Sequence, residues 1–249
     1  MPAEAGGQRG RIVATPDVKA LCFDVFGTVV DWRASIAREA AAAFASLGIE
    51  RDWHAFADAW RARYQPAMEE VRSGRRPWTR LDVLHRENLL AVLDELAIEG
   101  LSASEIDRLN RAWHRLEPWP DVTPGLTRLK RTFILATLSN GDVAMMVAIA
   151  RRAGLPWDAV LGAEVARAYK PQPEAYLRSA ALLDLAPAAC LMVAAHNSDL
   201  AAALALGFRT AYVHRPTEYG PGQSADLGPE RDYDVVAASF TELADKLGC

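Results

Sequence analysis

The chain has 249 residues, of which 51% are hydrophobic and 24% charged, and its formal net charge at pH 7 is −4. This composition supports a sizeable packed core and excludes global disorder, and the acidic balance argues against a nucleic-acid partner. The three cysteines, Cys22, Cys190 and Cys249, form no CxxC pair, so we expect neither a disulfide framework nor a zinc site.

Residues 1–16 are rich in glycine, alanine and polar side chains, and we expect them to form a flexible N-terminal tail. No apolar stretch follows the first methionine, so a secretion signal is not expected. No run of about 18 apolar residues occurs either, which argues against a membrane span. We therefore expect a cytoplasmic protein with no membrane partner.

The first predicted element is a strand at residues 18–24, an apolar run that ends on the acid Asp24. The pair Gly27-Thr28 ends it. From residue 32 the pattern becomes helical in four stretches, at 34–48, 56–74, 81–98 and 102–116. The all-helical character of this block predicts a domain inserted at residues 32–117.

A proline-rich connector at 119–125 follows the helical block, and strands and helices then alternate. We expect strands at 133–138, 159–162, 190–194 and 210–213 with an edge strand at 233–236, and helices at 143–153, 173–183 and 200–206. Such alternation is typical of an α/β fold with a doubly wound parallel sheet. The predicted core domain comprises residues 17–31 and 118–249.

Polar residues follow the apolar strands of this predicted core. In open α/β sheets, ligands bind outside the carboxyl ends of the strands. The residues expected there are Asp24, Thr28, Ser139, Asn140, Lys170 and the segment 196–199. Their convergence predicts a polar site at this edge of the sheet.

Four segments with this placement carry a family resemblance. The runs Asp24-Val25-Phe26-Gly27-Thr28, Leu138-Ser139-Asn140 and Tyr169-Lys170-Pro171 and the loop before Asp199 resemble the four ordered motifs of the haloacid dehalogenase superfamily. The resemblance covers roughly residues 18–245. It implies a Rossmann-like core, a helical cap at 32–117 and a nucleophilic Asp24.

Three positions distinguish the branches of that superfamily. Its phosphatases carry a second aspartate two residues after the nucleophile, and a Gly-Asp pair at the fourth motif whose aspartate binds Mg²⁺. This chain has Phe26, Ala194 and Ala195 there. Since a hard cation needs several oxygen ligands, we expect no metal, no other cofactor and no phosphoryl transfer. The remaining pattern is similar to the L-2-haloacid dehalogenases, which work without metal.

This resemblance implies a mechanism. Ionised Asp24 attacks C2 of a 2-haloacid, expels halide and forms an ester. Arg61, which matches the family's cap arginine, reaches the leaving halide, and Lys170 holds Asp24 ionised. Water then hydrolyses the ester at its carbonyl carbon, so the configuration at C2 is inverted. Asp199, alone or together with Lys170, orients or deprotonates this water.

Further residues are expected to bind or support the substrate. The Ser139 hydroxyl and the backbone N–H groups of Val25 and Phe26 are predicted to hold the substrate carboxylate, and Thr28 to support the Asp24 loop. Other predicted substrate-binding residues are Asn140, Tyr176, Asn197 and Trp78.

The fourth motif departs from the subfamily pattern, which has a serine and an asparagine where this chain has Ala194 and His196. His196 either assists water activation or narrows the leaving-group pocket, so that a small halogen fits best. Because some relatives accept fluoroacetate, we hypothesise that this protein also takes fluoro- or chloroacetate.

Two other functions stay open from the sequence. One is a phosphatase-like hydrolase of the same superfamily acting on a small phosphorylated metabolite, and the other is a catalytically silent binding protein on this fold. The expected partners are a 2-haloacid and water. Family members are often dimers, which favours a homodimer. Halogen preference, chain length and stereochemical strictness stay open.

Overall fold

The computed structural model describes residues 17–249, so the tail predicted for residues 1–16 lies outside the described residues. Its centre is a six-stranded parallel sheet in the order β5-β4-β1-β6-β7-β8. The strands are β1 (Ala20–Phe23), β4 (Ile134–Ser139), β5 (Ala159–Gly162), β6 (Cys190–Ala194), β7 (Arg209–Val213) and β8 (Val235–Ala237). The predicted doubly wound parallel sheet is confirmed.

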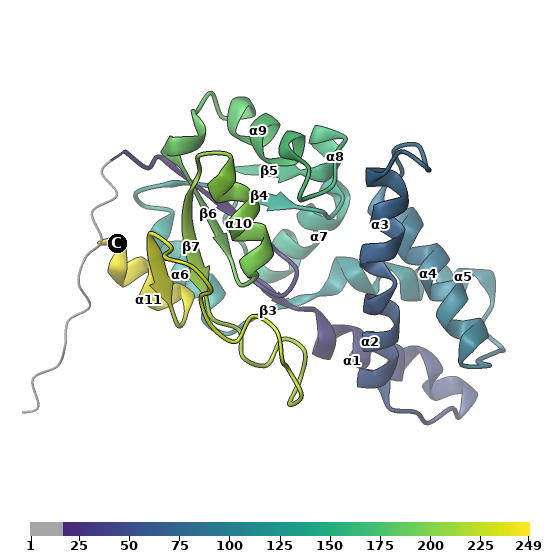
Figure 1. Cartoon of the computed structure of the whole chain (residues 1–249). Helices are drawn as coiled ribbons and strands as arrows, with labels where there is room; N and C mark the ends of the chain where they lie inside the picture. Colours follow the sequence, from purple (N-terminus) through teal and green to yellow (C-terminus); the bar gives the residue numbers. More distant parts are fainter. Residues whose placement is uncertain (1–16) are drawn as a thin grey trace, which may run out of the picture.

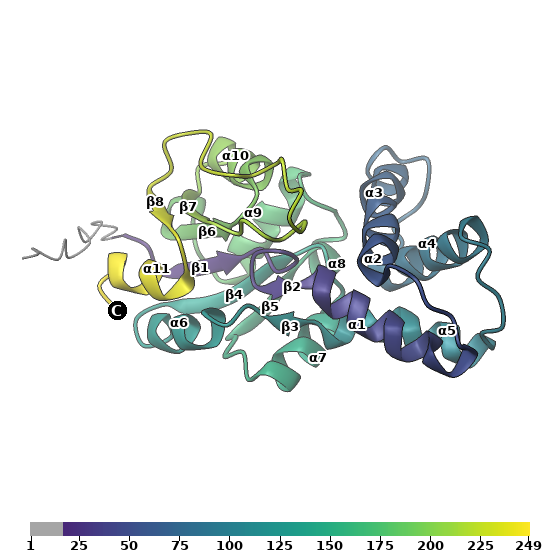
Figure 2. The ribbon, with the colours of Figure 1, turned by 90° about the horizontal axis from the view of Figure 1, so that it is seen from below.

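Helices cover both faces of this sheet, as Figure 2 shows. On one face lie α9 (Pro173–Leu182) and α10 (Asn197–Ala205), and on the other α6 (Val122–Leu129), α7 (Val143–Ala153) and α11 (Phe240–Lys246). The short helices α8 (Ala163–Ala166) and η3 (Pro187–Ala189) complete this domain.

The alternation of side chains along β1 explains its apolar sequence. Leu21 and Phe23 belong to the core cluster that includes α6, α7 and α11, whereas Ala20 and Cys22 belong to the cluster with α9 and α10. Because both faces are buried, every residue of the strand is apolar.

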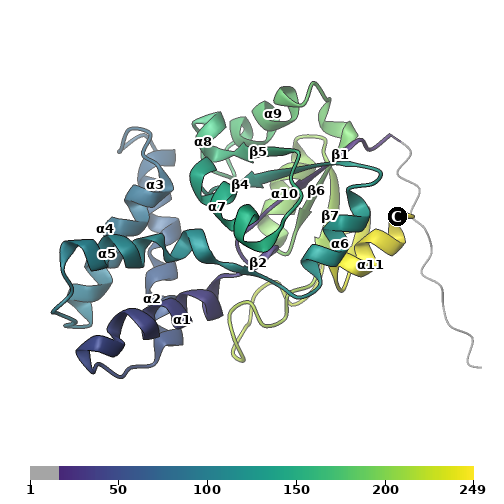
Figure 3. The ribbon, with the colours of Figure 1, turned by 180° about the vertical axis from the view of Figure 1, so that it is seen from behind.

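The helical block lies beside the carboxyl ends of the strands (Figures 1 and 3). A small antiparallel pair of β2 (Val30–Asp31) and β3 (Glu117–Pro118) leads into and out of it. Its helices are α1 (Trp32–Phe44), η1 (Ala45–Leu47), α2 (Trp53–Ala62), α3 (Tyr64–Arg72), α4 (Leu81–Glu95), α5 (Ala103–Asn110) and η2 (Arg111–Arg115). The domain boundaries at 32 and 117 stay a prediction.

Several elements differ from the sequence expectation, among them α8, α11 and the β2–β3 pair, which were not predicted, and the stretch 102–116, which is α5 followed by η2. The stretch 56–74 is two helices, α2 and α3, because Pro66 has no N–H to donate back to the carbonyl of Ala62. The connector contains α6, whose Pro124 lies in the first turn, where proline is tolerated. Helix α10 begins at Asn197 rather than residue 200.

Hydrogen bonds join the helical block to the core around the sheet edge. Asp142, directly before α7, accepts the backbone N–H groups of Leu81 and Asp82 at the start of α4 over 3.0 and 2.8 Å. Arg72 donates to the carbonyl of Lys170 over 2.9 Å. These contacts fix the helical block against the core at the edge of the sheet where the site is expected. None of the helices within residues 17–249 is long and apolar enough to cross a bilayer.

Candidate active site

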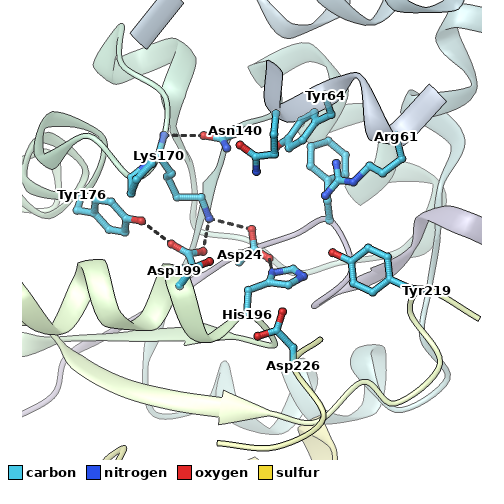
Figure 4. Close-up of a pocket in the computed structure, with 14 residues that line it drawn as sticks. Asp24, Arg61, Tyr64, Asn140, Lys170, Tyr176, His196, Asp199, Tyr219 and Asp226 are labelled. Carbon is cyan, nitrogen blue, oxygen red and sulfur yellow. Dashed lines mark hydrogen bonds and ion pairs between the residues drawn. The ribbon is translucent and has the colours of Figure 1, made fainter. Parts of the chain in front are cut away.

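A pocket of about 320 Å³ lies between the carboxyl ends of the strands and the helical block. Asp24, Lys170 and Asp199 line it from the core, and Arg61 and Tyr64 line it from the helical block (Figure 4). Most of the residues predicted at separate strand ends therefore meet in one place, namely Asp24, Asn140, Lys170, His196, Ser198 and Asp199. Within residues 17–249, no group of three or more His, Cys, Asp or Glu side chains is arranged to hold a metal ion.

Asp24 follows β1, and its backbone N–H extends the sheet by donating to the carbonyl of Val193 over 3.0 Å. Its carboxylate is buried, with Oδ1 accepting from Nζ of Lys170 and Oδ2 from the hydroxyl of Thr28, both over 2.8 Å. Burial alone would raise the pKa of Asp24, but Lys170 and His196 hold it well below its usual range. Asp24 is therefore an ionised carboxylate.

Lys170 lies between two carboxylates. Its ammonium also donates to Oδ2 of Asp199, and its backbone N–H donates to Oδ1 of Asn140 over 2.8 Å. Burial would lower the pKa of Lys170, yet Asp199 and Asp24 raise it above its ordinary value. The hydroxyl of Tyr176 donates to Oδ1 of Asp199 over 2.6 Å, so both oxygens of Asp199 are engaged.

The guanidinium of Arg61 is held among aromatic rings rather than beside a carboxylate. Its central carbon lies 3.9 Å from the ring centroid of Tyr64, 5.3 Å from that of Trp32 and 5.6 Å from that of Phe26. Nη1 is buried and finds no hydrogen-bond partner among residues 17–249. A desolvated donor that carries positive charge at a pocket wall is suited to an anion.

His196, directly before α10, lies between two carboxylates. Its Nδ1 is 3.1 Å from Oδ2 of Asp24, and its Nε2 is 2.9 and 3.1 Å from the two oxygens of Glu218. Burial would lower the pKa of His196, but Glu218 and Asp24 raise it well above its ordinary value. The resting side chain is an imidazolium that donates at both ring nitrogens.

Four of the predicted substrate-binding residues do not line the pocket: Val25, Ser139, Asn197 and Trp78. The hydroxyl oxygen of Ser139 instead accepts the N–H of Gly141 over 3.0 Å in the turn after β4. Asn197 donates to Asp226 and to the carbonyl of Gly228, which anchors the segment after β7. Trp78 packs on Tyr169 with ring centroids 4.8 Å apart.

The structure adds pocket residues that sequence reasoning missed, including Tyr64, Gln65, Tyr219 and Asp226. Tyr64 lies three residues after Arg61, so helical spacing could have indicated it. Tyr219 and Asp226 belong to the long segment between β7 and β8, and no periodic pattern there indicates which side chains face inward.

Comparisons with known proteins agree with this arrangement. Residues 18–207 match the model of a family of haloacid dehalogenase-like hydrolases. An (S)-2-haloacid dehalogenase of Xanthobacter autotrophicus is 30% identical over 203 residues, which cover 80% of this chain and 76% of the relative.

Two crystal structures resemble the fold over nearly its whole length. The defluorinating L-2-haloacid dehalogenase Rha0230 superposes with a TM-score of 0.92 at 47% identity, covering 97% of this chain and 100% of that one. The L-2-haloacid dehalogenase PA0810 superposes with a TM-score of 0.90 at 46% identity, covering 93% and 99%.

Proposed function

The chain belongs to the haloacid dehalogenase-like hydrolases, and we propose that it hydrolyses the carbon–halogen bond of short 2-haloacids to give 2-hydroxy acids and halide. Relatives named (S)-2-haloacid dehalogenases support this reaction class. The two structures with 46–47% identity also bear the name L-2-haloacid dehalogenase.

One observation carries the proposal: an ionised carboxylate and a guanidinium whose Nη1 has no hydrogen-bond partner within residues 17–249 line the same small pocket. Asp24 can attack a saturated carbon. Arg61 offers its buried Nη1 to the anion that leaves, and among residues 17–249 this donor has no hydrogen-bond partner. Its attraction to a halide grows as the carbon–halogen bond breaks, which stabilises the transition state more than the substrate.

The proposed first step forms a bond between an oxygen of Asp24 and C2 of the haloacid, and the halide leaves with the bonding pair. In the second step, water adds to the carbonyl carbon of the resulting ester. The hydroxy acid departs with the original Asp24 oxygen, Asp24 is regenerated, and one proton is released. Because only the first step acts at C2, the configuration there is inverted.

We also propose that fluoroacetate is a substrate. The pocket is small, and Arg61 presents to it a buried charged donor, Nη1, that has no hydrogen-bond partner among residues 17–249. Fluoride accepts strong hydrogen bonds, so it benefits from such donors as it leaves. The relative Rha0230 is described as defluorinating. A fluoride electrode tests this: release from fluoroacetate is expected, and none above a blank, with chloride released normally from chloroacetate, would contradict it.

The phosphatase alternative meets an obstacle at Phe26. Its ring packs edge-on against Trp113 and Tyr64, with centroids 5.8 and 6.2 Å apart. A phenyl group transfers no proton, so the position two residues after Asp24 offers no general acid or base.

Halide release from fluoro-, chloro- and bromoacetate and both enantiomers of 2-chloropropionate tests the proposal. Turnover is expected for the acetates and one enantiomer, and Asp24→Asn should lower it by roughly 10⁴-fold, because an amide is a poor nucleophile. The same preparations are assayed with p-nitrophenyl phosphate and Mg²⁺. Phosphate release without halide release would favour the phosphatase. If neither phosphate nor halide is released, a binding protein would be favoured.

A further inference from the structure

Glu218, in the segment between β7 and β8, is a buried carboxylate that no sequence motif indicates. Only 1% of its surface is exposed. Its Oε1 accepts the indole N–H of Trp32 over 3.0 Å, and both oxygens face Nε2 of His196. Glu218 does not line the pocket, and His196 is the pocket residue whose side chain it meets at hydrogen-bond distance.

The surrounding backbone is shaped to admit this carboxylate. Gly27 adopts φ +85°, and a Cβ built there would lie 2.0 Å from Oε1 of Glu218. No other residue fits at position 27 without displacing Glu218. Because Gly27 has no side chain, the carboxylate of Glu218 can pack against the loop that follows Asp24.

Arg215, three residues before Glu218, fixes the segment to the core. Its guanidinium makes a bidentate pair with Asp121 over 2.9 and 3.0 Å and donates to the carbonyl of Thr28 over 2.9 Å. Arg215 itself is buried. The segment that carries Glu218 is thus anchored to the core three residues before it.

The other candidate for activating water is already occupied. Asp199 uses Oδ2 for Lys170 and Oδ1 for Tyr176. His196 differs because one of its partners changes during the reaction. When Asp24 becomes an ester it loses its charge, and only Glu218 still attracts the imidazolium. Glu218 then keeps the proton on Nε2, while the proton on Nδ1 passes to solvent, which leaves Nδ1 as an acceptor beside the ester carbonyl.

We propose that Glu218 is a positioning residue that makes His196 the general base for hydrolysis of the Asp24 ester; this inference rests on the function proposed above. Nδ1 takes a proton from water as its oxygen bonds to Cγ of Asp24. It returns that proton to the departing oxygen of the hydroxy acid. Asp24 leaves this step as a carboxylic acid and gives its proton to Nδ1 of His196, 3.1 Å from Oδ2, which restores the resting imidazolium and leaves one proton released per turnover.

Pre-steady-state halide release from chloroacetate by Glu218→Gln tests this assignment. The variant should release one halide per enzyme at a rate within threefold of the wild type. Its steady-state turnover should fall by about 10²–10⁴-fold, the usual contribution of general base catalysis. Intact-protein mass spectrometry should then show a carboxymethyl adduct, located at Asp24 by peptide mapping. Glu230→Gln, an equal change of charge in the same segment, should behave like the wild type.

Other outcomes would overturn it. Steady-state turnover of Glu218→Gln within threefold of the wild type excludes a role in ester hydrolysis. A burst slowed as much as turnover, with no adduct, places Glu218 in alkylation or binding. If circular dichroism shows that Glu218→Gln is unfolded, His196→Asn removes the same contact and must accumulate the adduct. Wild-type protein that releases no halide from any haloacid contradicts the proposed function instead.

Discussion

The hydroxyl of Thr28 donates a 2.8 Å hydrogen bond to Oδ2 of Asp24 and accepts the N–H of Ala195 over 2.9 Å. All three groups are buried. This one side chain therefore connects the loop after β1 to the loop after β6 and fixes their relative positions. The carboxylate is therefore oriented by Thr28 and His196 on Oδ2 and by Lys170 on Oδ1.

Replacing Thr28 with valine keeps the shape of the side chain but removes both hydrogen bonds. The N–H of Ala195 is then buried without a partner, which should lower the free energy of unfolding by about 1–3 kcal/mol. The chloride burst should also slow, because Asp24 loses an orienting donor. Urea denaturation and stopped-flow chloride detection measure the two effects. Thr28→Ser keeps the hydroxyl and should lie near the wild type; equal losses in both variants would contradict this role.

Arg61→Met should lower kcat by roughly 10²–10³-fold, the usual cost of removing a donor that stabilises charge in a transition state. The loss should be largest with fluoroacetate, because fluoride depends most on donors as it leaves. Halide release with fluoro-, chloro- and bromoacetate measures the trend. Arg63→Met is the matched control, since Arg63 pairs with the exposed Glu95. A loss of the same size for all three halogens would argue against contact with the halide.

Asp142 couples the start of α4 to the core, and burial raises its pKa to about 6. An unfolded aspartate ionises near pH 3.9, so the folded state binds this proton more tightly. The contribution of Asp142 to stability should therefore fall as pH rises from about 4 through 6. Urea unfolding of wild type and Asp142→Asn across this range tests the sign. The stability of the wild type relative to the variant should decrease with pH; a constant difference would contradict it.

Much of the site could be predicted from the sequence because strand ends in a parallel sheet converge. Asp24, Asn140, Lys170 and Asp199 each follow or adjoin a predicted strand, and the structure brings all four to one pocket. An apolar run marks a buried strand, and the polar residues that follow it mark the end of that strand. Both features are local in the sequence, so they can be recognised in order along the chain.

Residues placed by long-range packing were not predictable in this way. Glu218 reaches His196 from an aperiodic segment, and its carboxylate occupies space left free by Gly27, which lies far away in the sequence. Ser139 shows the reverse error. It follows a strand as expected, but its hydroxyl oxygen closes a local turn onto the N–H of Gly141, a use that strand-end placement does not distinguish from substrate binding.

A single turnover in H2¹⁸O, with enzyme in excess over chloroacetate, tests most directly whether Asp24 is the nucleophile. If water attacks the carbonyl carbon of an Asp24 ester, the heavy oxygen must appear in the Asp24 carboxylate, and the hydroxy acid must carry none. Mass spectrometry of the peptide containing Asp24 and of the released glycolate measures both. Heavy oxygen in the glycolate and none in Asp24 would show that water attacks C2 directly, and would contradict the account.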